Sequence, residues 1–229
     1  QTIPTKTITT KTLKADYPIA IEFSGWNTGM IAVNSASDVI LNGEIRNRAG
    51  TTTITAGDAG VALAGVSTAN RSIVQNNDLA LITSRDLTLS ATGSVGGTLN
   101  SDPARSIQTA LTGVLNASAG NGNVLVTQTI GDMRVGAVTA TGNPLAGTGR
   151  VILNSDGNIV ADSVASLIQG GRVDLTSENG GVGSIADPLA VNVGYTDNLI
   201  DRRFYGLRAV AAGDIGIETQ AWSGNTDGN

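Results

Sequence analysis

The sequence predicts an all-β protein, and within that class a right-handed parallel β-helix (a β-solenoid) of short strands with loop excursions. Three observations support this prediction. Hydrophobic residues make up 40% of the 229 residues but aromatic residues only 3%, so Val, Ile, Leu and Ala must fill the core. Thirty glycines are available for tight turns. Short apolar alternations, each followed by a polar turn with glycine, recur along the chain.

Each recurrence predicts a short strand, a turn at Gly, Asn-Gly or Asp-Gly, and a second short strand. The recurring units are 38–47, 86–96, 123–136, 150–161, 172–185 and 213–220. The step from Arg150 to Arg172 fits a coil of about 20 residues, and the longer steps require insertions. A β-sandwich or propeller would instead place hairpin strands at spacings of about 8 to 12 residues, usually around a more aromatic core.

Two further features fit coils better than helices or isolated hairpins. The segment 106–117 comes closest to helical periodicity, but Gly113 and its β-branched neighbours weaken a helix there. Asn and Thr recur at the expected corners, where identical polar side chains of successive coils can stack into ladders.

The stretch "RVDLTSENGGVGSIADPLAVNV" (172–193) shows the expected coil in most detail. Strand alternation predicts Val173 and Leu175 inside the core and Asp174 and Thr176 outside it. Val182 and Ile185 are expected to re-enter the core, and Asp187-Pro188 to begin the next corner. The pair Gly180-Gly181 is expected to turn the first corner with positive φ angles.

Residues 1–25 and 26–229 are predicted to differ in role. The first segment is rich in Thr and Lys and alternates, which suits a capping or edge strand that prevents end-to-end stacking. The remainder is expected to form the repeat shaft, as a fragment of a larger protein. Trp26 and Trp222 are expected to pack against coils, although Trp222 could also stack on a sugar.

Charge and composition disfavour several classes of function. A net charge of −5 with scattered basic residues disfavours nucleic acid, and no apolar run is long enough for a membrane-spanning helix. Without His or Cys, the chain has no Ser-His-Asp triad, no Cys nucleophile and no His-bound metal. We expect no catalytic residue, no metal and no cofactor. The turns at 154–158, 180–185 and 225–229 approach calcium-binding sequences, but they lack the carboxylates that complete such sites.

One polar stretch, "GYTDNLIDRRFYG" (194–206), interrupts the repeat and is expected to form a surface loop. Its aromatic and charged side chains make it the best candidate binding loop, in which tyrosines could stack on sugar rings and the charged groups could bind hydroxyls or uronic carboxylates. The candidate binding residues are Tyr195, Asp197, Asp201, Arg202, Arg203 and Tyr205.

The segments "NVLVTQTIGDMRVGAVTATG", "RVILNSDGNIVAD", "RVDLTSENGGVGSIADPLAVNV" and "AVAAGDIGIETQ" resemble the β-helical repeat shafts of bacterial exoproteins of the filamentous-haemagglutinin type, which use two-partner secretion. The resemblance covers roughly residues 80 to 220. It implies a right-handed β-helix at or beyond the bacterial surface, with roles in adhesion, self-association or carriage of a distal effector. The secretion domain of such proteins carries Asn-Pro-Asn motifs, whereas this chain has Asn143-Pro144-Leu145, so it resembles an interior segment.

These observations predict a non-enzymatic shaft or adhesin segment of a secreted or surface-exposed bacterial protein. The expected partners are glycans or proteins of host or neighbouring cells, with self-association as a further possibility. The alternative is a polysaccharide-binding or polysaccharide-degrading β-helix, such as a lyase or depolymerase. A groove lined by carboxylates, basic residues and Tyr195, Tyr205 or Trp222 would favour that alternative.

Overall fold

The computed structural model describes residues 21–22, 29–61, 67–77, 79–97, 105–143, 148–194 and 206–219. Strands dominate these residues, and the one described helical element is the 3-10 turn η1 (Ala59–Val61). The strands are β1 (Ile21–Glu22), β2 (Met30–Ser35), β3 (Val39–Leu41), β4 (Ile45–Ala56), β5 (Ile73–Gln75), β6 (Leu81–Ala91), β7 (Ile107–Leu111), β8 (Val114–Ala119), β9 (Val124–Gln128), β10 (Met133–Ala140), β11 (Arg150–Ser155), β12 (Ile159–Ala161), β13 (Leu167–Gly170), β14 (Arg172–Ser177), β15 (Leu189–Val193), β16 (Gly206–Ala211) and β17 (Ile217–Thr219).

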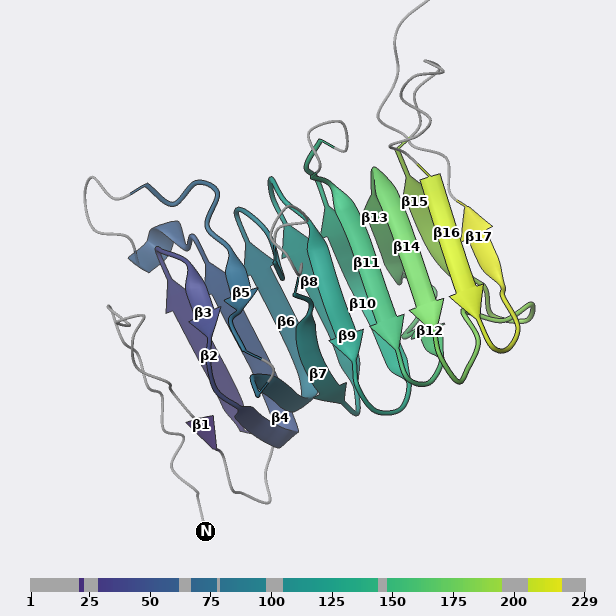
Figure 1. Cartoon of the computed structure of the whole chain (residues 1–229), viewed down its shortest axis with the longest axis horizontal. Helices are drawn as coiled ribbons and strands as arrows, with labels where there is room; N and C mark the ends of the chain where they lie inside the picture. The colour runs from purple at the N-terminus through teal and green to yellow at the C-terminus, as the bar shows by residue number, and fades with distance from the viewer. Residues whose placement is uncertain are drawn as a thin grey trace, which may run out of the picture.

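All strand pairs of the described residues are parallel, and fifteen strands join in one sheet. The main path runs β16-β14-β11-β9-β7-β6-β8-β10-β13-β15-β17, while β3 and β5 form a separate pair. Figure 1 shows the strands side by side along the long axis, from the purple N-terminal strands at one end to the yellow C-terminal strands at the other. The predicted all-β class is confirmed, and none of these pairs is the antiparallel pair of a hairpin.

The sheet curls because its longest strands bend. The first half of β6, Leu81–Ser84, pairs with β7, whereas its second half, Leu87–Ala91, pairs with β8. Strand β4 likewise has a register shift between Asn47 and Thr51 where it lies against β6. At each bend, one strand continues from one set of paired strands into a second set. The inward side chains of both sets belong to one hydrophobic core.

Equivalent inward positions of successive strands form continuous columns in this core. One column is wholly aliphatic, and all its members are at most 3% exposed: Ile54, Leu89, Ala117, Val138, Ile168 and Val191. A second column is polar and also buried: Thr109, Gln128, Ser155 and Ser177. In-register stacking therefore places like side chains above one another, so that aliphatic residues fill a core with few aromatic residues.

The predicted step from Arg150 to Arg172 is confirmed, because β11 and β14 pair from Arg150↔Arg172 to Ser155↔Ser177. Other steps differ in length. The step is shorter where Ile107 pairs with Val126, and it is much longer where Arg172 pairs with Gly206. The strands stay aligned, so the connecting segments absorb the difference.

Stacked asparagines of the kind predicted at the corners occur as isolated pairs and not as continuous ladders. Asn76 donates a hydrogen bond to Asn42 at 2.8 Å, and Asn121 donates one to Asn70 at 2.8 Å. The segment 106–117 forms β7 and β8, so its weak helical periodicity did not indicate a helix.

The detailed expectations for residues 172–193 are confirmed in part. Val173, Leu175 and Val182 are fully buried, as predicted. Ile185 was predicted in the core and is 89% exposed, so that prediction was wrong. The chain loops outward between the bridge at Val182 and the start of β15, and Ile185 lies on this loop. Asp174 points away from the core as expected, but arginine side chains bury it.

The predicted role of the two glycines was also wrong in its mechanism. Neither Gly180 nor Gly181 has a positive φ; the nearby left-handed residue is Gly183, with φ 59°. The two glycines are instead required by close backbone approach. A Cβ at Gly180 would lie 2.6 Å from the Asn158 nitrogen, and one at Gly181 would lie 2.6 Å from the Asp214 oxygen.

Most of the predicted capping segment 1–25, together with Trp26 and Trp222, lies outside the described residues. Within that segment, β1 pairs in parallel with β4. Among the residues that the structure describes, no helix has the length and apolarity needed to span a membrane.

Candidate functional site

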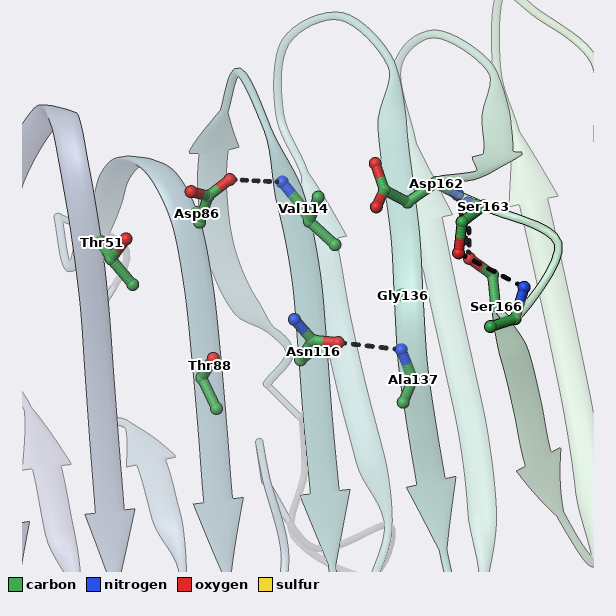
Figure 2. A pocket seen from close by; sticks show the side chains of 11 residues that line it. Thr51, Asp86, Thr88, Val114, Asn116, Gly136, Ala137, Asp162, Ser163 and Ser166 are labelled. Carbon is green, nitrogen blue, oxygen red and sulfur yellow. Dashed lines mark hydrogen bonds between the residues drawn. The ribbon is translucent and has the colours of Figure 1, made fainter.

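An open groove with a volume of about 490 Å³ lies on the outer surface of the sheet (Figure 2). Strands β4, β6, β8 and β10 and the segment between β12 and β13 form its walls and floor. The lining residues are Thr51, Asp86, Thr88, Val114, Asn116, Gly136, Ala137, Asp162, Ser163, Ala165 and Ser166. Most of these side chains are polar, and none is aromatic.

Strand register brings these residues together although they are far apart in the sequence. Thr51 pairs with Asp86, and Thr88 pairs with Asn116 on the next strand. Leu87, Leu89 and Leu115 point into the core, so the intervening Thr88 and Asn116 point outward. The groove is thus a patch of outward positions from successive strands.

A β-bulge shapes the floor of the groove. In the pairing of β8 with β10, Leu115 faces Val135 and Ala117 faces Val138, so Asn116 lies opposite both Gly136 and Ala137. The Asn116 Oδ1 atom accepts a hydrogen bond of 2.9 Å from the Ala137 amide. A Cβ at Gly136 would lie 2.4 Å from that same Oδ1 atom. Glycine at position 136 therefore leaves the space that the Asn116 side-chain amide occupies.

Asp86 is held in place by a network of hydrogen bonds. Its Oδ1 accepts from the Val114 amide at 3.0 Å, and its Oδ2 accepts from Arg85 Nε at 2.8 Å. Burial alone would raise the pKa of Asp86, but the hydrogen bonds from Val114, Arg85 and Thr51 and the charge of Arg85 together lower it. The carboxylate is therefore ionised and fixed in orientation at neutral pH.

The segment that follows β12 closes one side of the groove. The buried Ser166 hydroxyl accepts hydrogen bonds from the backbone amides of Asp162, at 3.1 Å, and Ser163, at 3.0 Å. This turn places the Asp162 carboxylate at the groove, where its Oδ1 lies 3.8 Å from Arg134 Nη1. Figure 2 shows Asp86 and Asp162 in one row, with Thr88, Asn116 and Ala137 in a second row toward the C-terminal ends of the strands.

The groove offers hydroxyl groups, an amide and two carboxylates, which suit hydrogen bonding to a polar ligand. In the described part of the chain, no group of three or more His, Cys, Asp or Glu residues could hold a metal ion. No protein-family model, curated protein or solved structure matches the chain. The resemblance to exoproteins of the filamentous-haemagglutinin type therefore stays a prediction.

The binding loop predicted from the sequence lies outside the described residues. This applies to all six of its candidate residues: Tyr195, Asp197, Asp201, Arg202, Arg203 and Tyr205. The residues on either side of it are held by backbone hydrogen bonds. The Gly194 amide donates to the Gly170 oxygen at 2.9 Å, and the Gly206 amide donates to the Gly171 oxygen at 3.2 Å. Gly194 and Gly206 are therefore bound by two consecutive residues, Gly170 and Gly171.

The groove itself was not predicted. Its residues fall into groups separated by roughly one coil each, and only the strand register brings them into one patch. One local signal did exist: "ADSVAS" (161–166) interrupts the apolar alternation between Ile159 and Ile168 with two small hydroxyl residues and an aspartate. Such an interruption indicates a corner that projects side chains outward.

Proposed function

We propose that the curled parallel sheet is a right-handed β-helix and that the chain serves as the shaft of an exported bacterial surface protein. The observation that supports this is the in-register column structure of the core. Val124, Val151 and Val173 occupy the same position on three successive strands, and Leu207 continues the column on a fourth. These four strands stack in register on their neighbours, as in repeat proteins of quasi-one-dimensional shape.

A rod of this kind acts mechanically. Its ladder of parallel hydrogen bonds holds a distal tip away from the cell, and its long lateral surfaces can make many weak contacts with other cells or with copies of the rod. The chain is thus proposed as an adhesin shaft at or beyond the outer surface of a bacterium.

We infer a structural rather than a catalytic role. Asp86, the most firmly held carboxylate of the groove, has a lowered pKa and is engaged by the Val114 amide and Arg85. A general acid needs a pKa near the working pH, so Asp86 is poorly suited to act as the general acid of a glycosidase.

Removal of one whole coil tests the architecture. Deletion of residues 150–171 takes out a complete step of the ladder and brings Arg172 directly after Gly149, so that β14 can take the place of β11 against β9. We expect the shortened protein to fold with a β-rich circular dichroism spectrum. Small-angle X-ray scattering should show a particle shorter by about one strand spacing, roughly 4.8 Å.

Deletion of residues 150–160 alone, half of that coil, is the matched control. It breaks the column of inward positions and should prevent cooperative folding. If the whole-coil deletion unfolds as completely as the half-coil deletion, the stacked-coil architecture is wrong.

The surface role is tested separately, by labelling intact and permeabilised cells of the source organism with an antibody against the chain. Signal only after permeabilisation would exclude that role.

A further inference from the structure

We propose that the groove over β4, β6, β8 and β10 binds a segment of saccharide that carries no acidic groups. The inference does not depend on the role of the chain as a shaft, because it rests on the geometry of one surface patch. The lining combines hydrogen-bond donors, acceptors and small apolar groups on a single open face. A sugar, with its hydroxyl rim and C–H faces, presents the complementary set.

Two hydrogen-bonding groups in the groove are available to a ligand. Within the described part of the structure, the Thr88 hydroxyl has no protein partner, and Asn116 uses only its Oδ1 atom, as acceptor from Ala137. The Asn116 amide nitrogen and the Thr88 hydroxyl come from adjacent strands and point outward at paired positions. Neighbouring strands lie about 4.7–4.9 Å apart, close to the length of one sugar ring.

The two carboxylates supply acceptors for sugar hydroxyls. An ionised carboxylate has about four acceptor positions, of which Asp86 uses part for Val114, Arg85 and Thr51. Asp162 faces Arg134 only at 3.8 Å, which leaves its acceptor positions open. Hydrogen bonds from neutral hydroxyls to a carboxylate are stronger than bonds between two neutral groups.

The same carboxylates determine which saccharides are excluded. Arg85 and Arg134 pair with them, yet neither arginine lines the groove, so the lining carries two negative charges and no positive charge. A uronic acid or sulfated sugar would bring like charge against Asp86 and Asp162. The groove therefore selects neutral or amino-bearing saccharides over acidic ones.

The floor of the groove suits the apolar face of a sugar ring. Val114, Ala137 and Ala165 are the apolar lining side chains, and the Asn116 and Val114 side chains fill the space that a side chain at Gly136 would take. With no aromatic residue in the lining, each contact is weak, so useful affinity requires several sugar units or several copies of the groove.

The test measures binding of three oligosaccharides to the full chain by titration calorimetry: a neutral β-glucan hexamer, a glucosamine hexamer and a galacturonate hexamer. We expect the first or second to bind and the third to be inactive.

Thr88→Val, which removes one hydroxyl without changing the shape, should weaken binding about fivefold, and Asp162→Asn about tenfold. The controls are Thr55→Val, an outward threonine of β4 that does not line the groove, and Asp187→Asn, an exposed carboxylate elsewhere.

Each result decides the question. Selective binding that both groove variants weaken, and neither control changes, supports the groove as the site. Circular dichroism of all four variants confirms that they remain folded. The proposal is overturned if none of the three saccharides binds, if the galacturonate binds best, or if the groove variants bind as tightly as the controls.

Discussion

Arg150 donates a hydrogen bond of 2.7 Å from Nη2 to Oδ2 of Asp174, across the pair formed by β11 and β14. Arg172, which precedes Asp174 on its own strand, contacts the same oxygen from Nε at 3.1 Å. The Asp174 side chain is 9% exposed. Two arginines from adjacent strands thus enclose one carboxylate on the outer face of the sheet and connect the strands by charge as well as by backbone hydrogen bonds.

Asp174→Asn is expected to destabilise the protein at pH 7 by on the order of 2 kcal/mol, because it leaves the two arginines without a countercharge. Urea unfolding measures this difference. Asp187→Asn, at an exposed position, is the control and should change the free energy of unfolding by less than about 0.5 kcal/mol.

The same carboxylate predicts a dependence of stability on pH. Burial alone would raise the pKa of Asp174, but the hydrogen bonds and charges of Arg150 and Arg172 together lower it below that of an unfolded aspartate. Its contribution is therefore fully present above about pH 4 and is lost as the pH falls through the lower folded-state value. Urea unfolding from pH 7 to pH 2 should show the stability difference between wild type and Asp174→Asn narrowing below about pH 4. A difference that stays constant over this range would contradict the assignment.

Two glycine substitutions distinguish crowding from backbone conformation. Gly181→Asn should cost about 1–3 kcal/mol, because any side chain at this position meets the Asp214 backbone. Gly131 has φ 69°, and a Cβ added there would meet no atom within 4 Å. Gly131→Asn should therefore cost less than about 1 kcal/mol, since asparagine tolerates this conformation. Thermal unfolding of the two variants provides the comparison, and equal losses would show that crowding is not the cause.

Gln128 is the most highly bonded side chain of the buried polar column. Its Oε1 accepts from the Leu111 amide at 3.1 Å and from the Thr109 hydroxyl at 3.0 Å, while its Nε2 donates to the oxygens of Leu111 and Ile130 at 2.8 and 2.9 Å. Gln128→Leu should destabilise the protein by about 2–4 kcal/mol, because it leaves several buried backbone groups without partners. Gln169→Leu, on the outer face of β13, is the matched control with an expected change near zero. Chemical denaturation of both proteins measures the difference, and similar stabilities would mean that water replaces the lost partners.

The sequence was most informative where alternation and spacing were both regular. Val151 and Leu153 alternate with outward residues, and the same pattern returns one coil later at Val173 and Leu175, so strands β11 and β14 could be aligned in advance. Prediction failed where the alternation changes phase. In β6 the buried residues are Ile82 and Ser84 before the bend and Leu87 and Leu89 after it, so the inward side changes from even to odd positions.

The groove could not be predicted for a related reason. Whether Asp86 lies beside Thr51 or beside another residue depends on the register between two strands that are distant in the sequence. Because the connecting segments differ in length, this register cannot be deduced from the sequence. Asn116 is a further case, because its role follows from the bulge at Gly136 and Ala137, which no local pattern indicates. Alternation specifies which side of a strand faces outward, but not which outward groups become neighbours.

The unequal steps between aligned strands have a consequence for how such a chain can change. The short step from Ile107 to Val126 and the long step from Arg172 to Gly206 support the same alignment, because lengthening a connection costs little conformational entropy compared with the contacts of one added strand. The connecting segments can therefore differ in length and sequence while the paired strands keep the same alignment. We expect that the length and sequence of a corner such as 162–166 can change while the strands on either side keep their alignment.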